Sequence, residues 1–312
     1  MTNINRCDTE TISTAQPNCR FSIITVSLNA AKTIEHTIKS VLSQTFPAYE
    51  YIIIDGGSTD GTRDIIERYR SHFSHVVFEP DNGIYDAFNK GVRLASGDVI
   101  GILNADDIYT PWALEKVAEA RINHPEAGVL YGDVFVLDEE KTEVSTNIAD
   151  HTKLHNSMIC HQGVFVTHET YDKFGLYDTT FKIASDRDML LRFMGKGVVF
   201  YNVDSFLAVY RAGGVSSQSY KLEIVRIYWR HLPFLKAFIK TFFYMSKIII
   251  KSCINIIMGA VLGNLWVRLK RMRRLRLERK AMALSKTGKV SKTLDENFHG
   301  SIEDVLAFAQ EK

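Results

Sequence analysis

Paired cysteines and a large net charge are both missing from this sequence. Its four cysteines, Cys7, Cys19, Cys160 and Cys253, include no pair at CxxC spacing, so neither a zinc site nor a redox motif is expected. We expect these thiols to be reduced, in a reducing compartment. The formal net charge of only +2 gives no reason to expect the whole chain to bind nucleic acid.

Two targeting signals are also missing. The first 16 residues are polar and lack the basic-then-apolar pattern of a signal peptide, which predicts a cytoplasmic location. No run reaches the ~20 apolar residues that a clean bilayer span needs. The 312 residues, 46% of them hydrophobic, are enough for one large packed domain with an appendage or for two modest domains.

Short apolar segments of strand type alternate with helix-type segments from residue 20 onward. Strands are predicted at residues 21–26, 51–54, 76–78, 99–103, 129–136, 164–166 and 198–203. Helices are predicted at residues 33–42, 61–69, 85–94 and 186–193, and another near Pro111. This order favours an α/β fold with a mostly parallel sheet covered on both faces.

Polar residues follow three of these strands directly: Asn29, Asp55-Gly-Gly57 and Asp106-Asp107. Because ligands of such sheets bind beyond the carboxyl ends of the strands, the site is expected there. The glycines, Gly56 among them, let the backbone approach a ligand closely. Asp55 can accept from a nucleobase imide and from ribose hydroxyls, whereas Asp60 is interpreted as the cap of the next helix.

The segment Asn104-Ala-Asp-Asp107 predicts a metal site. Adjacent carboxylates repel each other unless a cation lies beside them, and a divalent metal on a diphosphate would supply that charge. Oxygen ligands suit Mg²⁺ or Mn²⁺, so Asp106 and Asp107 are the predicted ligands. The alternative is that one of them only caps the helix near Pro111.

Two helix starts carry further polar residues. After a turn at residues 79–83, a helix bears Asp86, Asn89 and Lys90, and its N-terminus can face an anion, although a capped surface helix remains an alternative for the last two. Asp186 and Asp188 begin a later helix and cannot share one face. One of them can remove the proton of an acceptor hydroxyl, and capping alone is the alternative.

Two weaker signals complete the set. His161 and Gln162 precede a strand and can line an acceptor pocket, although a lone histidine is more often structural. The segment Arg211–Ser217, with a glycine pair and two serines, suits a loop that closes over phosphates, and a plain surface loop is the alternative.

In this order, the segments resemble the family-2 glycosyltransferases, which have the GT-A fold, over about residues 20–217. The strongest elements are Ser27-Leu-Asn-Ala30, Asp55–Thr62, Pro80–Asp86 and Asn104–Asp107. Within the family, the chain looks most like bacterial polysaccharide enzymes of the colanic-acid or capsule type. The resemblance implies inverting transfer of a hexosyl group from a nucleoside diphosphate sugar, with a UDP-sugar favoured.

The resemblance also implies roles for individual residues. Asp55 matches the contact to the nucleobase, Asp106 the carboxylate near the ribose, and Asp107 the metal ligand. Asp186 matches the catalytic base, but many members have Glu-Asp where this chain has Ser185-Asp186, so Asp188 competes for that role. Asn104 stands where an aspartate is common, which shifts the metal to Asp106 and Asp107. The predicted donor-binding residues are Ser27, Asn29, Asp55, Gly56, Asp86, Asn89, Lys90, Asp106 and Arg211.

The C-terminal part has a different composition, so four parts are predicted: a polar leader at 1–19, the transferase domain at 20–222, an apolar and basic helical extension at 223–280, and a tail at 281–312. The pairs Lys236/Lys240 and Lys247/Lys251 each share a helical face within an apolar stretch. Residues 268–280 are strongly basic. This pattern favours a helix lying on an anionic membrane, at its cytoplasmic side, beside a lipid-linked acceptor. A helical bundle, monomeric or oligomeric, and a re-entrant or spanning hairpin are the alternatives.

Two other functions compete with sugar transfer. A sugar-phosphate nucleotidyltransferase would want a glycine-rich loop with Arg and Lys after the first strand, where Ser27-Leu-Asn-Ala-Ala31 stands. A membrane scaffold that binds nucleotide sugar without turnover is disfavoured by the intact acidic set.

Overall fold

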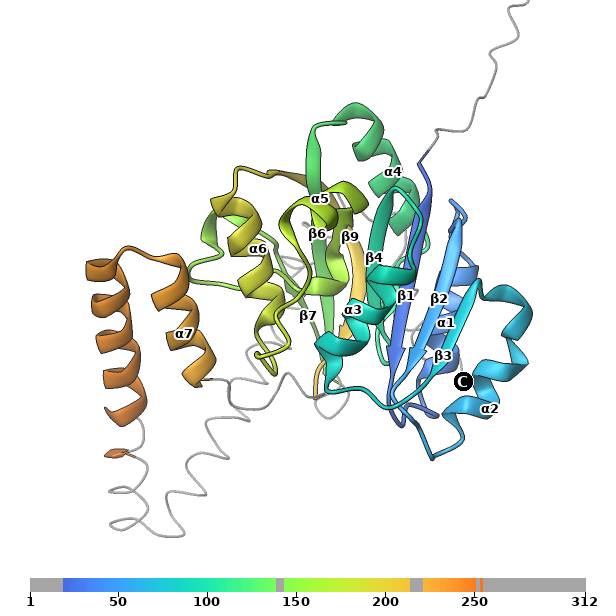
Figure 1. Ribbon diagram of the computed structural model, residues 1–312, viewed down its shortest axis with the longest axis horizontal. Helices are drawn as coiled ribbons and strands as arrows, with labels where there is room; N and C mark the ends of the chain where they lie inside the picture. Colours follow the sequence, from blue (N-terminus) through green and yellow to red (C-terminus); the bar gives the residue numbers. More distant parts are fainter. Residues whose placement is uncertain (1–18, 139–142, 214–220, 251–252, 255–312) are drawn as a thin grey trace, which may run out of the picture.

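The sheet is parallel in its first half and mixed in its second. The computed structural model describes residues 19–138, 143–213, 221–250 and 253–254. In these residues nine strands form one sheet of order β3-β2-β1-β4-β8-β6-β9-β5, with β7 paired to β6 (Figure 1). The strands are β1 (Phe21–Ser27), β2 (Glu50–Asp55), β3 (His75–Phe78), β4 (Val99–Asn104), β5 (Ile108–Tyr109), β6 (Ala127–Asp138), β7 (Glu143–Asn147), β8 (Val164–Thr167) and β9 (Val199–Arg211).

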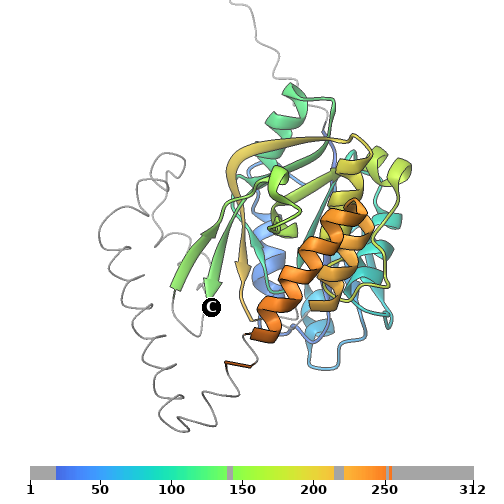
Figure 2. The same ribbon diagram turned by 90° about the vertical axis from the view of Figure 1, so that its left-hand side faces the viewer.

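Helices cover both faces of this sheet (Figure 2). They are α1 (Ile34–Leu42), α2 (Thr62–Arg68), α3 (Ile84–Leu94), α4 (Ala113–Asn123), α5 (His168–Phe174), α6 (Ser185–Gly195) and α7 (Lys221–His231). Alternate residues of the buried strands point to opposite layers: Ile24 packs with α3 and α6, and Ile23 packs with α1 and α4. The predicted α/β class and every predicted strand and helix through residue 203 are therefore confirmed.

The expectation of a mostly parallel sheet is wrong for the second half. Strands β1 to β4 pair in parallel, but β8 runs antiparallel to both β4 and β6, and β7 and β5 run antiparallel to β6 and β9. Strand β6 is followed by β7 without a helical crossover, and a direct connection of that kind pairs strands antiparallel. The two-residue β5 and the polar β7 carry too little hydrophobic pattern to have been predicted.

Helix α7 belongs to the transferase domain, so the predicted boundary at residue 222 is misplaced. Ile224 and Ile227 are buried in the same core layer as α3 and α6, and α7 lies beside α6 (Figure 1). Ile224 and Ile227 lie on one face of α7, and this face completes the core. The domain therefore continues at least to His231.

A second C-terminal helix, residues 234–250, packs outside α7. Ala237 is fully buried and Tyr244 meets Tyr228 edge to face, with ring centroids 6.2 Å apart. The outer side carries large exposed apolar side chains: Phe234, Leu235, Phe238, Phe242, Phe243, Ile249 and Ile250. No helix in the described part of the chain has the length and apolar character needed to cross a membrane.

Only part of the predicted extension can be compared with the structure. Lys236 and Lys247 are exposed, but Lys240 donates to the carbonyl of His155 at 3.2 Å and to the side chain of Asn156. Lys240 is therefore bonded within the protein, and the predicted contact of this helix with a membrane stays a prediction. The predicted leader, the basic stretch at 268–280 and the tail lie outside the described residues.

Candidate active site

The polar segments predicted to form the site do meet at one edge of the sheet. Ser27 of β1 stands beside Asp55 of β2, and Val26 stands beside Asn104 of β4. Because these three strands are parallel, their carboxyl ends lie side by side. The motifs that follow them therefore surround one location, as expected.

Asp55 accepts four hydrogen bonds, three from its own turn and one from Ser27 of β1. Its Oδ2 accepts from the hydroxyls of Ser27 at 2.7 Å and Ser58 at 2.6 Å, and its Oδ1 accepts from the amides of Gly57 at 3.1 Å and Ser58 at 2.8 Å. The side chain is almost completely buried. Asp55 thus shapes the turn that ends β2. Its contact to a nucleobase stays a prediction, which would require a donor such as the Ser58 hydroxyl to turn away.

Asn29 ties the end of β1 to the same turn. It adopts φ +52°, in the left-handed region that Asn tolerates better than most residues. Its Oδ1 accepts from the Thr59 amide at 2.9 Å and its own amide donates to Ser58 Oγ at 2.8 Å. Asp60 accepts from the amide of Thr62, the first residue of α2, at 3.0 Å. Asp60 therefore supports the start of α2, although Gly61 and not Asp60 occupies the N-cap position.

Asp81 is a site residue that the sequence patterns did not single out. Its carboxylate lies so close to Gly56 that a Cβ on Gly56 would collide with Oδ2. Its Oδ1 accepts from the Gly83 amide at 2.9 Å. A side chain at residue 56 would therefore displace the Asp81 carboxylate from this contact between two loops.

The start of α3 carries a pair of charges that face each other. Asp86 Oδ2 accepts from the Asn82 amide at 3.0 Å and lies 3.7 Å from Lys90 Nζ. Lys90 Nζ also lies 2.9 Å from Glu79 Oε1. Lys90 is thus paired with two carboxylates, and its role in donor binding stays a prediction.

Asn89 does not face the ligand edge, and its assignment to donor binding is corrected. It is buried, its Nδ2 donates to the carbonyl of Tyr177 at 2.9 Å, and its Oδ1 accepts from the Tyr177 amide at 3.0 Å. Both ends of the amide are used, so Asn89 fastens the loop after α5 to α3.

The two carboxylates after β4 have different environments. Asp107 is fully buried; its Oδ2 accepts from Gln162 Nε2 at 2.7 Å and its Oδ1 from the Arg211 amide at 2.9 Å. Burial and the neighbouring Asp106 raise its pKa well above the ordinary value. Asp106 is less enclosed, and burial raises its pKa while Arg211 lowers it.

This geometry changes two assignments. Gln162 is buried against Asp107 and holds the turn after β4, so its placement on the acceptor side is corrected. Asp107 joins that turn to Gln162 and to the end of β9, which leaves Asp106 as the carboxylate that can reach a ligand. Nearby, Asn104 Oδ1 is buried without a hydrogen-bond partner.

A buried acid stands at the start of α6. Asp186 is 6% exposed, its Oδ1 accepts from the Arg187 amide at 2.7 Å and lies 3.3 Å from the Tyr85 hydroxyl, and its Oδ2 lies 3.8 Å from His161 Nδ1. Burial raises the pKa of Asp186 to about 7, whereas burial lowers the pKa of His161 to about 4. At neutral pH the imidazole is therefore neutral, and a carboxyl group whose pKa is raised toward neutrality suits a general base.

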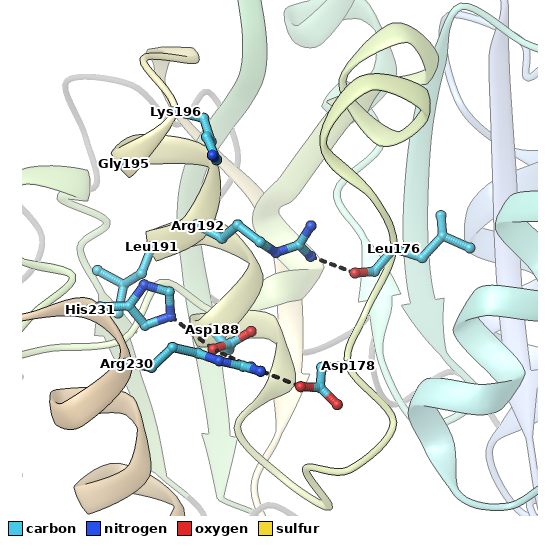
Figure 3. A pocket seen from close by; sticks show the side chains of 9 residues that line it. All are labelled: Leu176, Asp178, Asp188, Leu191, Arg192, Gly195, Lys196, Arg230 and His231. Carbon is cyan, nitrogen blue, oxygen red and sulfur yellow. Dashed lines mark hydrogen bonds and ion pairs between the residues drawn. The ribbon is translucent and has the colours of Figure 1, made fainter.

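Asp188 has a different environment, although it begins the same helix (Figure 3). It is 1% exposed and accepts from His231 Nε2 at 2.8 Å and from Arg230 Nη1 at 3.0 Å. Burial acts to raise the pKa of Asp188, but these two bonds lower it on balance. An ionised, fully paired carboxylate is a weak proton acceptor, so the geometry favours Asp186 as the base.

The partners of Asp186 and Asp188 were not found from the sequence. In the segment that contains Tyr85, the sequence pattern points to Asp86 instead. Glu223, Arg230 and His231 of α7 fall in the predicted helical extension at 223–280. The only sequence signal was the spacing of Glu223, Arg226 and Arg230, which puts all three on one face of a helix.

A family model described as glycosyl transferase family 2 matches residues 22–179. Among curated proteins, a PGL/p-HBAD biosynthesis glycosyltransferase of Mycobacterium bovis (strain BCG / Pasteur 1173P2) is 30% identical over 212 residues, which is 66% of this chain and 82% of that protein. The putative teichuronic acid biosynthesis glycosyltransferase TuaG of Bacillus subtilis (strain 168) is 30% identical over 230 residues, 69% of this chain and 90% of that one.

Solved structures show the same fold. A fragment of S. aureus TarS, residues 1–349, in complex with UDP-GlcNAc matches with a TM-score of 0.56 and 17% identity over 67% of this chain. This chain spans 64% of that fragment, and 39% of the longer TarS chain. At this identity the likeness concerns the fold alone.

Proposed function

The chain is a member of glycosyl transferase family 2, and from this membership we propose that it transfers a hexosyl group from a nucleoside diphosphate sugar to a saccharide acceptor, with inversion at the anomeric carbon. A UDP-sugar is the favoured donor, because the similar TarS fragment was solved with UDP-GlcNAc. The similarity to a PGL/p-HBAD and to a putative teichuronic acid biosynthesis glycosyltransferase supports a role in making a cell-surface glycoconjugate. We further propose that the product is a polysaccharide of the capsule or colanic-acid type.

The observation that carries the proposal is the position of Asp186, a buried carboxyl group 3.8 Å from His161, whose neighbour Gln162 donates to Asp107 at the turn after β4. In the proposed reaction its carboxylate removes the proton of the acceptor hydroxyl. The new C–O bond forms as the bond from the anomeric carbon to the diphosphate breaks, on the opposite side of that carbon. The products are the extended saccharide and the free nucleoside diphosphate.

We also propose a divalent cation, Mg²⁺ or Mn²⁺, at the turn after β4. The described residues contain no group of three or more His, Cys, Asp or Glu side chains arranged to hold a metal. Such a cation needs only one or two carboxylates when the substrate phosphates supply further oxygens. Asp106 and the unpartnered Asn104 Oδ1 fit that requirement, and Asp107 supports them. When bound, the cation would offset the charge that builds on the leaving diphosphate.

The helix of residues 234–250 supports a further part of the proposal, which is attachment to the cytoplasmic side of an anionic membrane. Phe234, Phe238 and Phe242 are exposed on it, with Lys236 and Lys247 also reaching solvent. An apolar helix face with lysines beside it is the pattern of a helix lying in the membrane interface. Such a position would bring the site to lipid-linked acceptors.

The test combines binding and product release. Thermal shift with a panel of nucleoside diphosphate sugars and Mn²⁺ identifies the donor, and release of free nucleoside diphosphate with a saccharide acceptor measures transfer. We expect stabilisation by one donor and release that Asp186→Asn removes. Binding without release would support a non-catalytic scaffold. Formation of a nucleotide sugar from a nucleoside triphosphate and a sugar phosphate would support a nucleotidyltransferase, and either result would contradict the proposal.

A further inference from the structure

We infer that Glu223 of α7 is a positioning residue for Asp186. This inference rests on the proposed function, because it assigns to α7 a part in holding the base of that reaction.

The carboxylate of Glu223 accepts hydrogen bonds from three consecutive backbone amides. Its Oε1 accepts from Lys182 at 2.7 Å, and its Oε2 accepts from Ile183 at 3.1 Å and Ala184 at 3.0 Å. Ala184 is the N-cap residue, directly before α6, and its own side chain makes no capping hydrogen bond. A carboxylate at this place satisfies unpaired amides and interacts favourably with the N-terminus of the helix.

One residue links this cap to the base. The Ile183 amide donates to Glu223, and the Ile183 carbonyl accepts from the hydroxyl of Tyr85. The same hydroxyl lies 3.3 Å from Asp186 Oδ1. Because the peptide groups on both sides of Ile183 move with its backbone, displacement of this residue changes where the Tyr85 hydroxyl points, and so changes its contact with Asp186.

Other residues of α7 contact the chain before α6 as well. Arg226 Nη2 donates to Thr180 Oγ1 at 2.7 Å, and its guanidinium lies 4.2 Å from the ring centre of Phe181. Arg230 bridges Asp178 at 2.8 Å and Asp188 at 3.0 Å (Figure 3). Several contacts thus fasten the segment 178–184 to α7, but only Glu223 contacts the amides next to Asp186.

The groups that face Asp186 come from four places. Tyr85 comes from α3, Cys160 and His161 from the chain around η3 (His161–Gly163), Tyr177 from the loop before α6, and Arg187 from α6 itself. Glu223 is not among them. Its effect on Asp186 must therefore pass through the backbone at 182–184 and through Tyr85.

The test compares Glu223→Gln with wild type in the full chain. Glutamine keeps the size of the side chain but has one acceptor oxygen instead of two, so at least one of the three amides loses its partner. We expect kcat to fall about tenfold or more, with the KM for the donor changed little, because a small displacement of a catalytic group has effects of that size. The acidic limb of the pH profile of kcat should move to higher pH, because the Tyr85 hydroxyl favours the ionised form of Asp186.

Three comparisons make this result specific. Glu119→Gln removes an exposed carboxylate from α4, on the opposite face of the sheet, and should leave kcat and its pH profile unchanged. Glu223→Asp keeps the charge and should be more active than Glu223→Gln. If Glu223→Gln does not fold, Glu223→Asp is compared with wild type in its place. In a double-mutant cycle, Tyr85→Phe should remove most of the effect of Glu223→Gln, because both act through one hydroxyl.

Two results would overturn the inference. One is that Glu223→Gln lowers Tm but leaves kcat and its pH limb unchanged, which is a structural role only. The other is that the effects of Glu223→Gln and Tyr85→Phe on kcat simply multiply. A ¹³C NMR titration of the Asp186 carboxyl in the substrate-free chain, assigned with Asp186→Asn, measures the same displacement without any transfer assay. If wild type transfers no sugar, the proposed function fails while this titration still decides the role of Glu223.

Discussion

Asp186 and Asp188 lie two residues apart at the start of α6 and have opposite environments. Asp186 has an uncharged phenol and a neutral imidazole near its carboxyl group, whereas Asp188 is bonded to Arg230 and to His231. Burial outweighs the nearby Arg187 and raises the pKa of Asp186 to about 7, whereas the bonds from α7 lower the pKa of Asp188. The two side chains therefore divide the tasks of a base and of an anchor.

The first prediction concerns catalysis by this pair. Asp186→Asn is expected to reduce kcat by ~10²-fold or more, because it removes the proton acceptor, with donor affinity little changed. The measurement is steady-state release of nucleoside diphosphate beside a donor-binding titration. If Asp188→Asn instead gives that kcat loss at normal stability, and Asp186→Asn does not, the assignment of the base is wrong.

The second prediction concerns pH. Asp186 acts as a base only when ionised, and its pKa is about 7. Turnover should therefore rise with pH through about 7 and level off above it. His161 should not produce a second limb in this range, because burial lowers its pKa to about 4. A profile of kcat that is flat from pH 5.5 to 8.5, under conditions where chemistry limits the rate, would contradict this account.

The third prediction is that the same two substitutions change stability in opposite directions. The pKa of Asp186 is raised on folding, so its contribution to stability is present at low pH and is lost as pH rises through about 7. Asp186→Asn should accordingly raise Tm at pH 8, with a gain that shrinks towards pH 5. The pKa of Asp188 is lowered, so its contribution is present at neutral pH and is lost on acidification.

Asp188→Asn should lower stability at pH 8, by about 3 kcal/mol if the loss resembles that of other buried ion pairs. The measurement for both variants is thermal or urea unfolding at pH 5, 6, 7 and 8. Equal shifts of Tm for the two variants at pH 8 would show that their environments do not differ in the way described.

The fourth prediction separates the two carboxylates after β4. Asp106→Ala should abolish activity at any concentration of Mg²⁺ or Mn²⁺, while Tm stays near that of wild type. Asp107→Ala should also be inactive, but it leaves Gln162 and the Arg211 amide without their acceptor and should lose roughly 1–3 kcal/mol for each. Full turnover of the wild type in excess chelator would rule out the cation.

The fifth prediction concerns the C-terminal helices. The full chain should sediment with vesicles that contain anionic lipid, and less so at higher salt, because screening weakens attraction to the headgroups. A chain that ends after Leu232 keeps α7 and should stay soluble and folded. A chain that ends after Tyr220 loses the buried Ile224 and Ile227 and should aggregate. If the full chain remains in the supernatant as an oligomer, a helical bundle replaces the membrane attachment.

Local sequence patterns were enough to predict the first half of the fold and the location of the site. Buried strands and amphipathic helices have periods of two and about 3.6 residues, which can be recognised within a short window. Polar residues that directly follow strands β1, β2 and β4 were enough to predict that they meet, because parallel strands place these ends together. The family resemblance rests on the same local segments, and the match of the family model to residues 22–179 confirms it.

The role of each polar side chain in those segments depends on contacts that form only in the folded protein. The partner of Asp107 is Gln162, 55 residues away, and the partners of Asp188 are 42 and 43 residues away on α7. No local period marks such pairs. Asp107, which accepts two hydrogen bonds in the core, and Asp106, which is partly exposed, look alike in the sequence. The first stabilises the fold, and the second can bind a ligand. Burial and distant partners, which exist only after folding, set the difference in pKa and therefore the choice of the base.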